Sequence, residues 1–487
     1  MIAVFIVYLA LLIGIVVYSA RRSKTNTDFI LGGKKISGIS LALSERATGE
    51  SAWLLLGLTG LAYSEGMAAI WVAAGCVAGI LFLWIFLAEP LQKLTEKTSA
   101  LTVPELFSKT FGRNERSFGI LTAIITIFFF ILYIAAQFNG SGKIFNDTFN
   151  IDPFWGMIIG SVLVTIYTML GGFITVVATD AFQAILMVFT CVVLPIIALF
   201  AAASMDLDIA QTIIHANYSV PMNQTSGQLT GGLLIINGLS WAFGYTGQPQ
   251  LLVRMMAMRN QAETRQSRCV AILWTLLAYG GAFMIGIIGF ELVKAGALGE
   301  MTSRIAADSE KIMPAMVVTL VNPILAGILL SGAVSAMMST ASSQLIVVST
   351  ASTEDLYQQV SKKKISEKKM LLLNKLLILA VGLIGFLLAI TMEDTVYGLI
   401  SYAWSGIGAS FGPAIVLLLF WKRFSLAGAF ASLITGTVSA VVWKTWLLEP
   451  TGISERLASY LLAFGMAILF SLFYPEKLEN QDKKIKQ

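Results

Sequence analysis

Three charged residues stand close together inside a stretch of sequence that is otherwise apolar. Glu45, Arg46 and Glu50 fall within six residues, and the i, i+4 spacing of Arg46 and Glu50 puts them on one helix face. A charged side chain at the centre of a membrane costs about 2.5–3.5 kcal/mol on insertion scales, so it usually pairs or serves function. Two interpretations follow: a structural ion pair, or a Glu50 that helps hold a cation or a substrate amine beside an unwound helix.

A second stretch has the composition of a helix break. Residues 241–249 read WAFGYTGQP, with two glycines and a proline inside apolar sequence. In transporters built from inverted repeats, substrate and ion sites lie at the membrane midplane, where the first helix of each repeat is interrupted. The two interruptions fall in the second and seventh of the membrane spans that we expect, 37–63 and 230–249. This spacing predicts inverted five-helix repeats, spans 2–6 and 7–11, each with a broken first helix.

Hydroxyl and aromatic side chains accompany these breaks. Most serines of the cluster at 335–343 can bond to their own helix or allow close helix packing, but adjacent Ser339 and Thr340 could supply neutral oxygens for a monovalent cation. Buried tyrosine and tryptophan offer flat apolar faces and need polar partners. The aromatic residues within the spans therefore suit a small organic solute, with core packing as the alternative for Trp53; they are Trp53, Tyr133, Trp241 and Tyr245.

The elements that must position these residues are membrane helices. Of 487 residues, 56% are hydrophobic and 13% are charged, against about 25% charged in a soluble domain. This composition excludes a soluble enzyme, a nucleic-acid binder and a disordered chain, and the long apolar runs exclude a membrane β-barrel. The first apolar run, 2–20, is expected to be a retained span and no signal peptide, because Arg21 and Arg22 follow it instead of preceding it.

The sequence predicts an all-α integral membrane protein of about 13 spans. They are expected at 2–20, 37–63, 66–88, 117–142, 154–171, 173–203, 230–249, 269–292, 322–350, 370–391, 396–420, 425–446 and 457–474. With the N-terminus outside and the C-terminus inside, 26 of the 33 Lys and Arg residues fall in inside segments and six in outside segments. The positive-inside rule supports that orientation.

The expected spans leave no room for a soluble catalytic domain. We expect one transporter domain over residues 1–475 and a short charged cytoplasmic tail over 476–487. The spans contain no nucleophile–base pair and no cluster of metal ligands, so neither an enzyme nor a cofactor is expected.

At these clusters the chain resembles the sodium:solute symporter family, most closely its bacterial sodium/proline symporters. The matching motifs are ILGGK (30–34), ALS (42–44), SAWLL (51–55), GGF (171–173), TD (179–180), GYTGQP (244–249), LAGILLS (325–331), MST (338–340), TEDLY (353–357) and SYAW (401–404). They extend over most of the chain.

The resemblance implies a thirteen-helix version of the inverted-repeat amino-acid transporter fold, with sodium as the coupling ion. It implies a sodium site formed by backbone carbonyls of Ala47 and Glu50 together with Ala336, Ser339 and Thr340. It implies a proline pocket near Ser51, Ala52, Tyr133, Trp241, Tyr245, Gln248 and Pro249. We assign coupling or gating to Glu45, Arg46, Gly49 and Asp180.

The chain departs from the proline symporters at Gly49 and Glu50, where they usually carry Asp followed by Met. A carboxylate moved one residue along a helix is rotated by about 100°. Backbone sodium ligands survive that change, since any residue supplies a carbonyl.

These observations predict a symporter that imports a small amino acid, expected to be L-proline, with Na⁺ by alternating access. The alternatives are another amino acid or carboxylate, proton coupling through Glu50, and a passive channel. The expected partners are the solute, Na⁺ and the lipid bilayer, with neither nucleic acid nor an obligate protein partner. The expected location is the cell membrane, a bacterial inner membrane.

Overall fold

The computed structural model describes residues 1–487 apart from 24, 113–115, 210–230, 362–365, 392–394 and 476–487. Every regular element in these described ranges is helical. The predicted tail at 476–487, and the basic residues that the orientation count took from these gaps, lie outside the described residues.

The helices are named in chain order. They are α1 (Ile2–Ala20), α2 (Asn26–Leu31), α3 (Gly38–Ala52), α4 (Thr59–Glu65), α5 (Ile70–Phe82), α6 (Ala88–Thr98), α7 (Val103–Phe111), α8 (Arg116–Phe149), α9 (Pro153–Ser204), α11 (Gly231–Leu239), α12 (Trp241–Tyr245), α13 (Pro249–Met256), α14 (Gln261–Lys294), α15 (Met301–Ala307), α16 (Ile312–Leu320), α17 (Pro323–Thr350), α18 (Gln358–Ser361), α19 (Glu367–Ala389), α20 (Val396–Phe420), α21 (Leu426–Val442), α22 (Leu448–Thr451) and α23 (Glu455–Phe473).

Ten helical stretches of the described chain are long and apolar enough to cross a membrane. Two of them, Gly38–Thr98 with 61 residues and Pro153–Ser204 with 52, far exceed one crossing, which needs about 20 residues. Each contains a glycine with backbone angles outside the helical region: Gly66 (φ 59°, ψ −133°) and Gly172 (φ 62°, ψ −156°). Glycine tolerates positive φ, so the chain can turn there without a side-chain clash.

Local sequence fixes where several helices begin. Asn322 caps α17 by accepting hydrogen bonds from the N–H groups of Ile324 and Leu325, with Pro323 in the first turn. Asp152 and Pro153 begin α9 in the same way. Cap side chains satisfy the free N–H groups of the first turn, and proline has no N–H to lose there.

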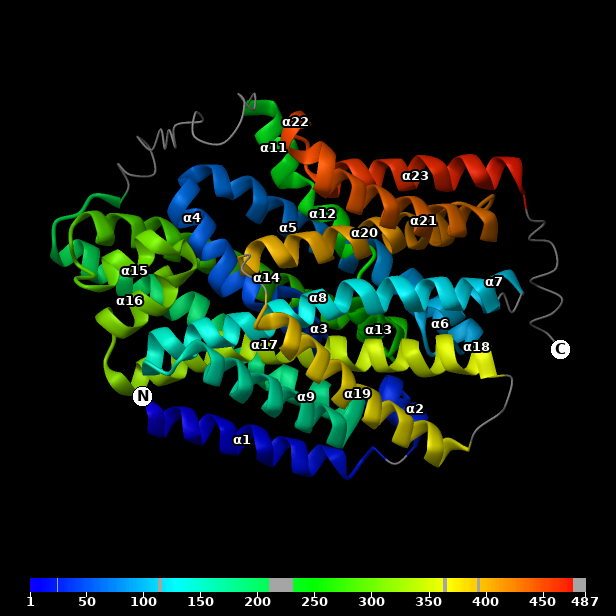
Figure 1. The fold of residues 1–487 in the computed structure, drawn as a ribbon, viewed down its shortest axis with the longest axis horizontal. Coiled ribbons are helices and arrows are strands. Elements are labelled where there is room, and N and C mark those ends of the chain that lie inside the picture. Colours follow the sequence, from blue (N-terminus) through cyan, green and yellow to red (C-terminus); the bar gives the residue numbers. More distant parts are fainter. Residues whose placement is uncertain (24, 113–115, 210–230, 362–365, 392–394, 476–487) are drawn as a thin grey trace.

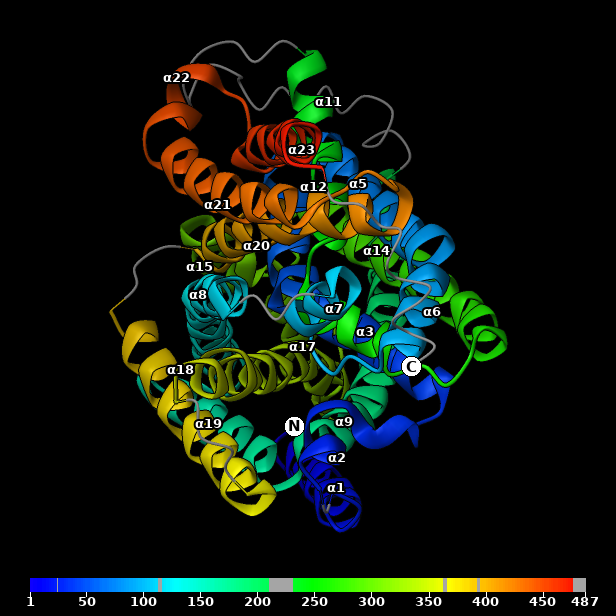
Figure 2. The same cartoon turned by 90° about the vertical axis from the view of Figure 1, so that its right-hand side faces the viewer.

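The centre of the bundle is α17, which packs against α9, α8 and α3 (Figure 1). Of the most apolar 18 residues of Pro323–Ser361, the helical stretch that begins with α17, 83% are buried. The corresponding share is 28% for α1 and for α19. Figure 2, viewed along the bundle, shows α17 and α3 inside, α1 and α19 at one edge, and α21 and α23 at another. Apolar residues on the outer helices therefore face lipid, whereas the polar residues of α3 and α17 face protein.

A glycine pair on α14 shows how closely its backbone approaches α9. A Cβ added at Gly281 would lie 1.8 Å from the carbonyl oxygen of Cys191, whereas one added at Gly280 would have no atom within 4 Å. Small residues let membrane helices approach to backbone contact.

We therefore expect Gly281→Ala to lower the thermal stability of the purified protein, by about 1–3 kcal/mol as for other overpacked sites. The matched control Gly280→Ala adds the same methyl group on the open side of the helix and is expected to be neutral or stabilising. Melting curves of both variants in detergent would measure this. Equal melting temperatures for the two variants would contradict the close α14–α9 contact.

Candidate functional site

The first predicted interruption is a real break in the helix. Ser51 has φ 48° and ψ −167°, which ends the regular geometry of α3, and the chain continues as the π-helical turn Trp53–Leu58. Two backbone N–H groups freed by the break find new acceptors. The N–H of Ala52 donates to Oε1 of Gln137 on α8 at 3.0 Å, and the N–H of Trp53 donates to Oγ of the nearby Ser51 at 3.1 Å. A non-glycine residue in this region costs about 1–3 kcal/mol and persists only where its surroundings enforce it.

The second predicted interruption is also present. Helix α12 ends at Tyr245, Gln248 is extended (φ −80°, ψ 106°), and α13 begins at Pro249. Nε2 of Gln248 donates to the carbonyl oxygen of Trp404 on α20 at 3.1 Å. A Cβ at Gly247 would lie 2.4 Å from a backbone nitrogen of α20, so only glycine allows this approach.

The oxygens of the predicted sodium site come together between α3 and α17. Oγ of Ser339 donates to the carbonyl oxygens of Ala47 at 3.0 Å and Ala336 at 3.1 Å, and Oγ1 of Thr340 donates to that of Thr48 at 2.9 Å. Neutral carbonyl and hydroxyl oxygens are suitable ligands for a hard cation. The carbonyl of Glu50 instead accepts the N–H of Trp53 within the broken helix.

Asp180 joins four helices beside these oxygens. Its Oδ2 accepts hydrogen bonds from Ser44 at 2.7 Å and Thr48 at 3.1 Å on α3 and from Arg254 of α13 at 3.2 Å. Oγ of Ser343 on α17 lies 2.9 Å from Oγ1 of Thr48 and accepts a hydrogen bond from Arg254. The buried carboxylate of α9 is therefore paired with the guanidinium of a helix that directly follows the second break.

The Glu45–Arg46–Glu50 cluster lies on another side of α3. Arg46 donates from Nε to Glu45 at 2.6 Å and from Nη2 to the other oxygen of Glu45. Its Nη1 donates to Glu50 at 2.8 Å and to Thr275 of α14 at 3.4 Å. Nε1 of Trp84 donates to Glu45 at 2.9 Å. The carboxylate of Glu50 thus faces away from Ser339 and Thr340.

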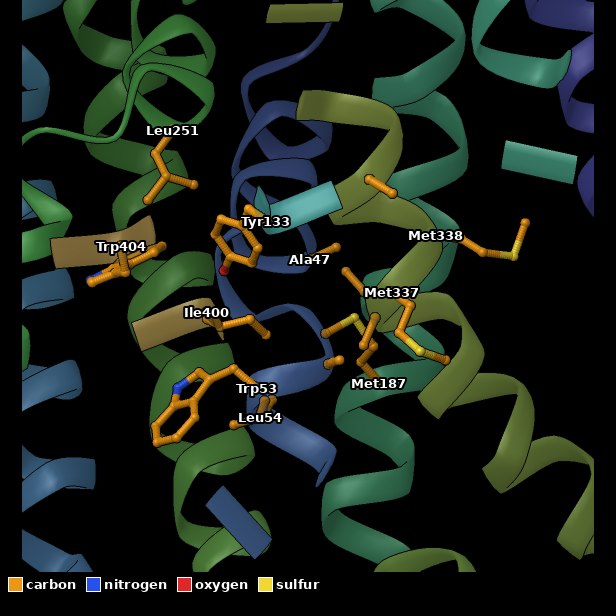
Figure 3. Close-up of a cluster of buried hydrophobic side chains, with 14 of the residues drawn as sticks. Ala47, Trp53, Leu54, Tyr133, Met187, Leu251, Met337, Met338, Ile400 and Trp404 are labelled. Atoms are coloured by element: carbon orange, nitrogen blue, oxygen red, sulfur yellow. The ribbon is translucent and has the colours of Figure 1, made fainter. Parts of the chain in front are cut away.

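The predicted substrate residues separate into two groups. Tyr133 donates to Ser51 at 3.2 Å, and the ring of Trp241 stacks on Trp53 with centroids 4.4 Å apart. The ring of Tyr245 meets Trp404 edge-on at 4.8 Å. In Figure 3, Tyr133 is drawn over the broken α3, and Trp404 and the ring of Trp53 appear to the left of it. By contrast, Pro249 lines a separate cavity of about 40 Å³ with Arg254 and Ser343.

Sequence reasoning missed Gln137, Trp404, Arg254, Tyr279 and Trp84 at this site. Gln137 follows Tyr133 by four residues, so helical spacing could have indicated that both face the same break. Among the described residues, several buried N–H donors here have no acceptor: Nε2 of Gln137 and Nε1 of Trp53, Trp241 and Trp404. Unpaired buried donors are costly, which makes them suitable partners for a solute with acceptor oxygens.

Comparison with known proteins adds independent evidence. The model of the sodium:solute symporter family matches residues 29–436. The high-affinity proline transporter PutP of Bacillus subtilis is 33% identical over 465 residues, which cover 95% of this chain and 94% of that protein. The sodium/proline symporter of Escherichia coli is 32% identical over 486 residues, covering 97% and 93%.

A solved structure shares the fold. A Na⁺-coupled sialic acid symporter in its substrate-bound, outward-open state superposes with a TM-score of 0.80 at 21% identity, covering 98% of each chain. The described helices of this chain therefore have the arrangement of a known transporter.

The Asp180–Arg254 pair gives a stability prediction. Arg254→Gln leaves a buried carboxylate without its cation, which typically costs about 3–5 kcal/mol. Arg265→Gln is the matched control, because Arg265 pairs with Glu89 and its side chain is 62% exposed; such surface pairs contribute about 0–1 kcal/mol. Thermal unfolding in detergent should show a much larger loss for Arg254→Gln. A loss no larger than that of Arg265→Gln would contradict the buried pairing.

Proposed function

The chain belongs to the sodium:solute symporter family, and we propose that it imports L-proline together with Na⁺ by alternating access. The observation that supports this most directly is the pair of helix breaks, at Ser51 and after Tyr245, together with the α3 carbonyl oxygens that Ser339 and Thr340 contact. Relatives of about one-third identity over nearly the whole chain are proline transporters.

We place Na⁺ among the predicted ligands Ala47, Glu50, Ala336, Ser339 and Thr340. Support comes from the hydrogen bonds that already join Ser339 to Ala47 and Ala336. A cation arriving there would replace hydroxyl protons as the partner of the carbonyl oxygens. Because these ligands span α3 and α17, bound Na⁺ would hold the first helix of one repeat against the rest of the bundle.

We place proline against Ser51, Ala52, Tyr133, Trp241 and Tyr245, with Gln137 and Trp404 added from the structure. The substrate carboxylate would accept hydrogen bonds from the unpaired N–H donors, and its apolar ring would lie against the aromatic faces. Gln248 and Pro249 belong in this proposal to the hinge of the second break. Glu45, Arg46, Gly49 and Asp180 remain proposed coupling or gating residues. Hydrogen bonds link Arg46 to Glu45 and Glu50 next to the first break, and Asp180 to Arg254 after the second.

The proposed topology has 13 spans, inverted repeats over spans 2–6 and 7–11, an outside N-terminus and an inside C-terminus. The stretches Gly38–Thr98 and Pro153–Ser204 would each supply two crossings, meeting at Gly66 and Gly172. The broken segment α11–α13 would supply the seventh. Residues 1–475 would form the single transporter domain of a bacterial inner-membrane protein, with 476–487 as a cytoplasmic tail.

The proposed coupling is energetically sufficient. One Na⁺ moving inward through about 100 mV releases about 2.3 kcal/mol, and a tenfold concentration gradient adds about 1.4 kcal/mol. The sum of about 3.7 kcal/mol can support several-hundred-fold accumulation of a neutral solute.

Uptake by proteoliposomes tests the proposed function. Labelled L-proline is expected to accumulate in sodium buffer and to equilibrate at most in choline buffer, with competition from proline exceeding that from other amino acids or small carboxylates. Accumulation driven by a pH gradient without sodium would show that the coupling ion is the proton and not Na⁺. Accumulation of another solute but not of proline would show that the substrate is wrong, and non-saturable equilibration would indicate a channel.

Thr340→Ala tests the sodium site. Losing one ligand oxygen should raise the sodium concentration for half-maximal uptake by about tenfold, equivalent to about 1.4 kcal/mol, with a smaller effect on the maximal rate. Thr122→Ala is the matched control, because Thr122 is equally buried but bonds only to carbonyls of its own helix, α8. A half-saturation unchanged in Thr340→Ala, or shifted equally in both variants, would count against the site.

A further inference from the structure

The guanidinium of Arg46 lies among oxygens of the kind that bind a metal cation. It is surrounded by both carboxylate oxygens of Glu45, by Oε1 of Glu50 and by Oγ1 of Thr275. These oxygens come from α3 and α14. Arg46, Glu45 and Glu50 are 0% exposed.

The cluster places two carboxyl groups against one guanidinium. Ionised Glu45 and Glu50 carry two charges and Arg46 balances one of them. The remaining lone pairs accept hydrogen bonds from Trp84 at 2.9 Å and from the hydroxyl of Tyr279. Hydrogen bonds from neutral donors stabilise a buried carboxylate, but they do not supply the positive charge that it needs inside a membrane.

The cluster is distinct from the proposed sodium site, although both use α3. The carbonyls of Ala47 and Thr48 meet α17, whereas the side chains of Arg46 and Glu50 meet α14. The cluster also touches both breaks. Glu50 immediately precedes the break at Ser51, and the hydroxyl of Tyr245, at the end of α12, lies 3.4 Å from Glu50 and 2.7 Å from the hydroxyl of Tyr279.

We propose that the Arg46 side chain is a resident cation filling a second cation site, formed by Glu45, Glu50 and Thr275 between the broken α3 and α14. Carboxylate and hydroxyl oxygens are ligands for a hard monovalent cation. Because the guanidinium is covalently attached and occupies the site, a free ion cannot bind there. A consequence, which rests on the proposed function, is that only the site near Ser339 and Thr340 loads and releases Na⁺ during transport.

Removing the tethered cation tests the site without any transport assay. Arg46→Ala leaves two buried carboxylates and vacant space, so it is expected to bind about one more Na⁺ or K⁺ per chain than the parent protein. Equilibrium binding of ²²Na⁺ to purified protein measures that number. The melting temperature of Arg46→Ala should also rise more steeply with NaCl or KCl than with choline chloride at equal ionic strength, because an ion that binds only the folded state stabilises it.

Two further variants separate a resident cation from a purely structural ion pair. Arg46→Lys keeps a cation but loses the forked hydrogen bonds, and is expected to match the parent in bound Na⁺ and to melt well above Arg46→Ala. In Arg46→Ala/Glu50→Gln one carboxylate is neutralised as well, which restores the original formal charge, so the additional ion should be lost.

Several results would overturn the proposal. They are an unchanged ion count in Arg46→Ala, a melting temperature of that variant that responds to acid but not to Na⁺ or K⁺, and an Arg46→Lys protein as unstable as Arg46→Ala. If Arg46→Ala fails to fold, an Arg46→Lys protein that also fails to fold would overturn the proposal. Failure of proline uptake would overturn the proposed function and leave the ion count interpretable.

Discussion

The structure depends on one constraint: a helix interrupted inside a membrane must have all its freed polar groups satisfied by protein. At Ser51 the backbone leaves the helical region, and the amide of Ala52 finds its acceptor in Gln137 of α8. After Tyr245, the side-chain Nε2 of Gln248 donates to the carbonyl oxygen of Trp404 on α20. Each break is thus tied to a helix that is distant in sequence. Rearranging either break requires those partners to change together.

Charge follows the same constraint. Two buried clusters flank the broken α3: Asp180 with Arg254 on one side, and Glu45 and Glu50 with Arg46 on the other. The first pairs one carboxyl group with one guanidinium, and the second pairs two carboxyl groups with one guanidinium. Between them, the proposed sodium ligands are all neutral oxygens.

Much of this architecture was readable from the sequence, because membrane helices are set by local rules. The apolar runs predicted an all-helical membrane protein, and the polar interruptions predicted both breaks, which the structure confirms. What the sequence could not show was pairing across distance. Gln137, Trp404 and Tyr279 acquire roles only when α8, α20 and α14 pack around the breaks. Arg254 falls between the expected spans 230–249 and 269–292, yet it is buried against Asp180. For the side chain of Glu50 the sequence left two interpretations open, an ion pair with Arg46 or a group that helps hold a cation; in the structure it pairs with Arg46 and turns toward α14.

The most direct test of sodium-coupled alternating access is the proline ratio at which net flux reverses in proteoliposomes held at a fixed voltage. With one transported Na⁺ per proline, the free energies of the two gradients balance at reversal. A sodium gradient made about tenfold steeper should then shift the reversing proline ratio by about tenfold. A reversal ratio that stays constant while the sodium gradient changes would contradict the coupling.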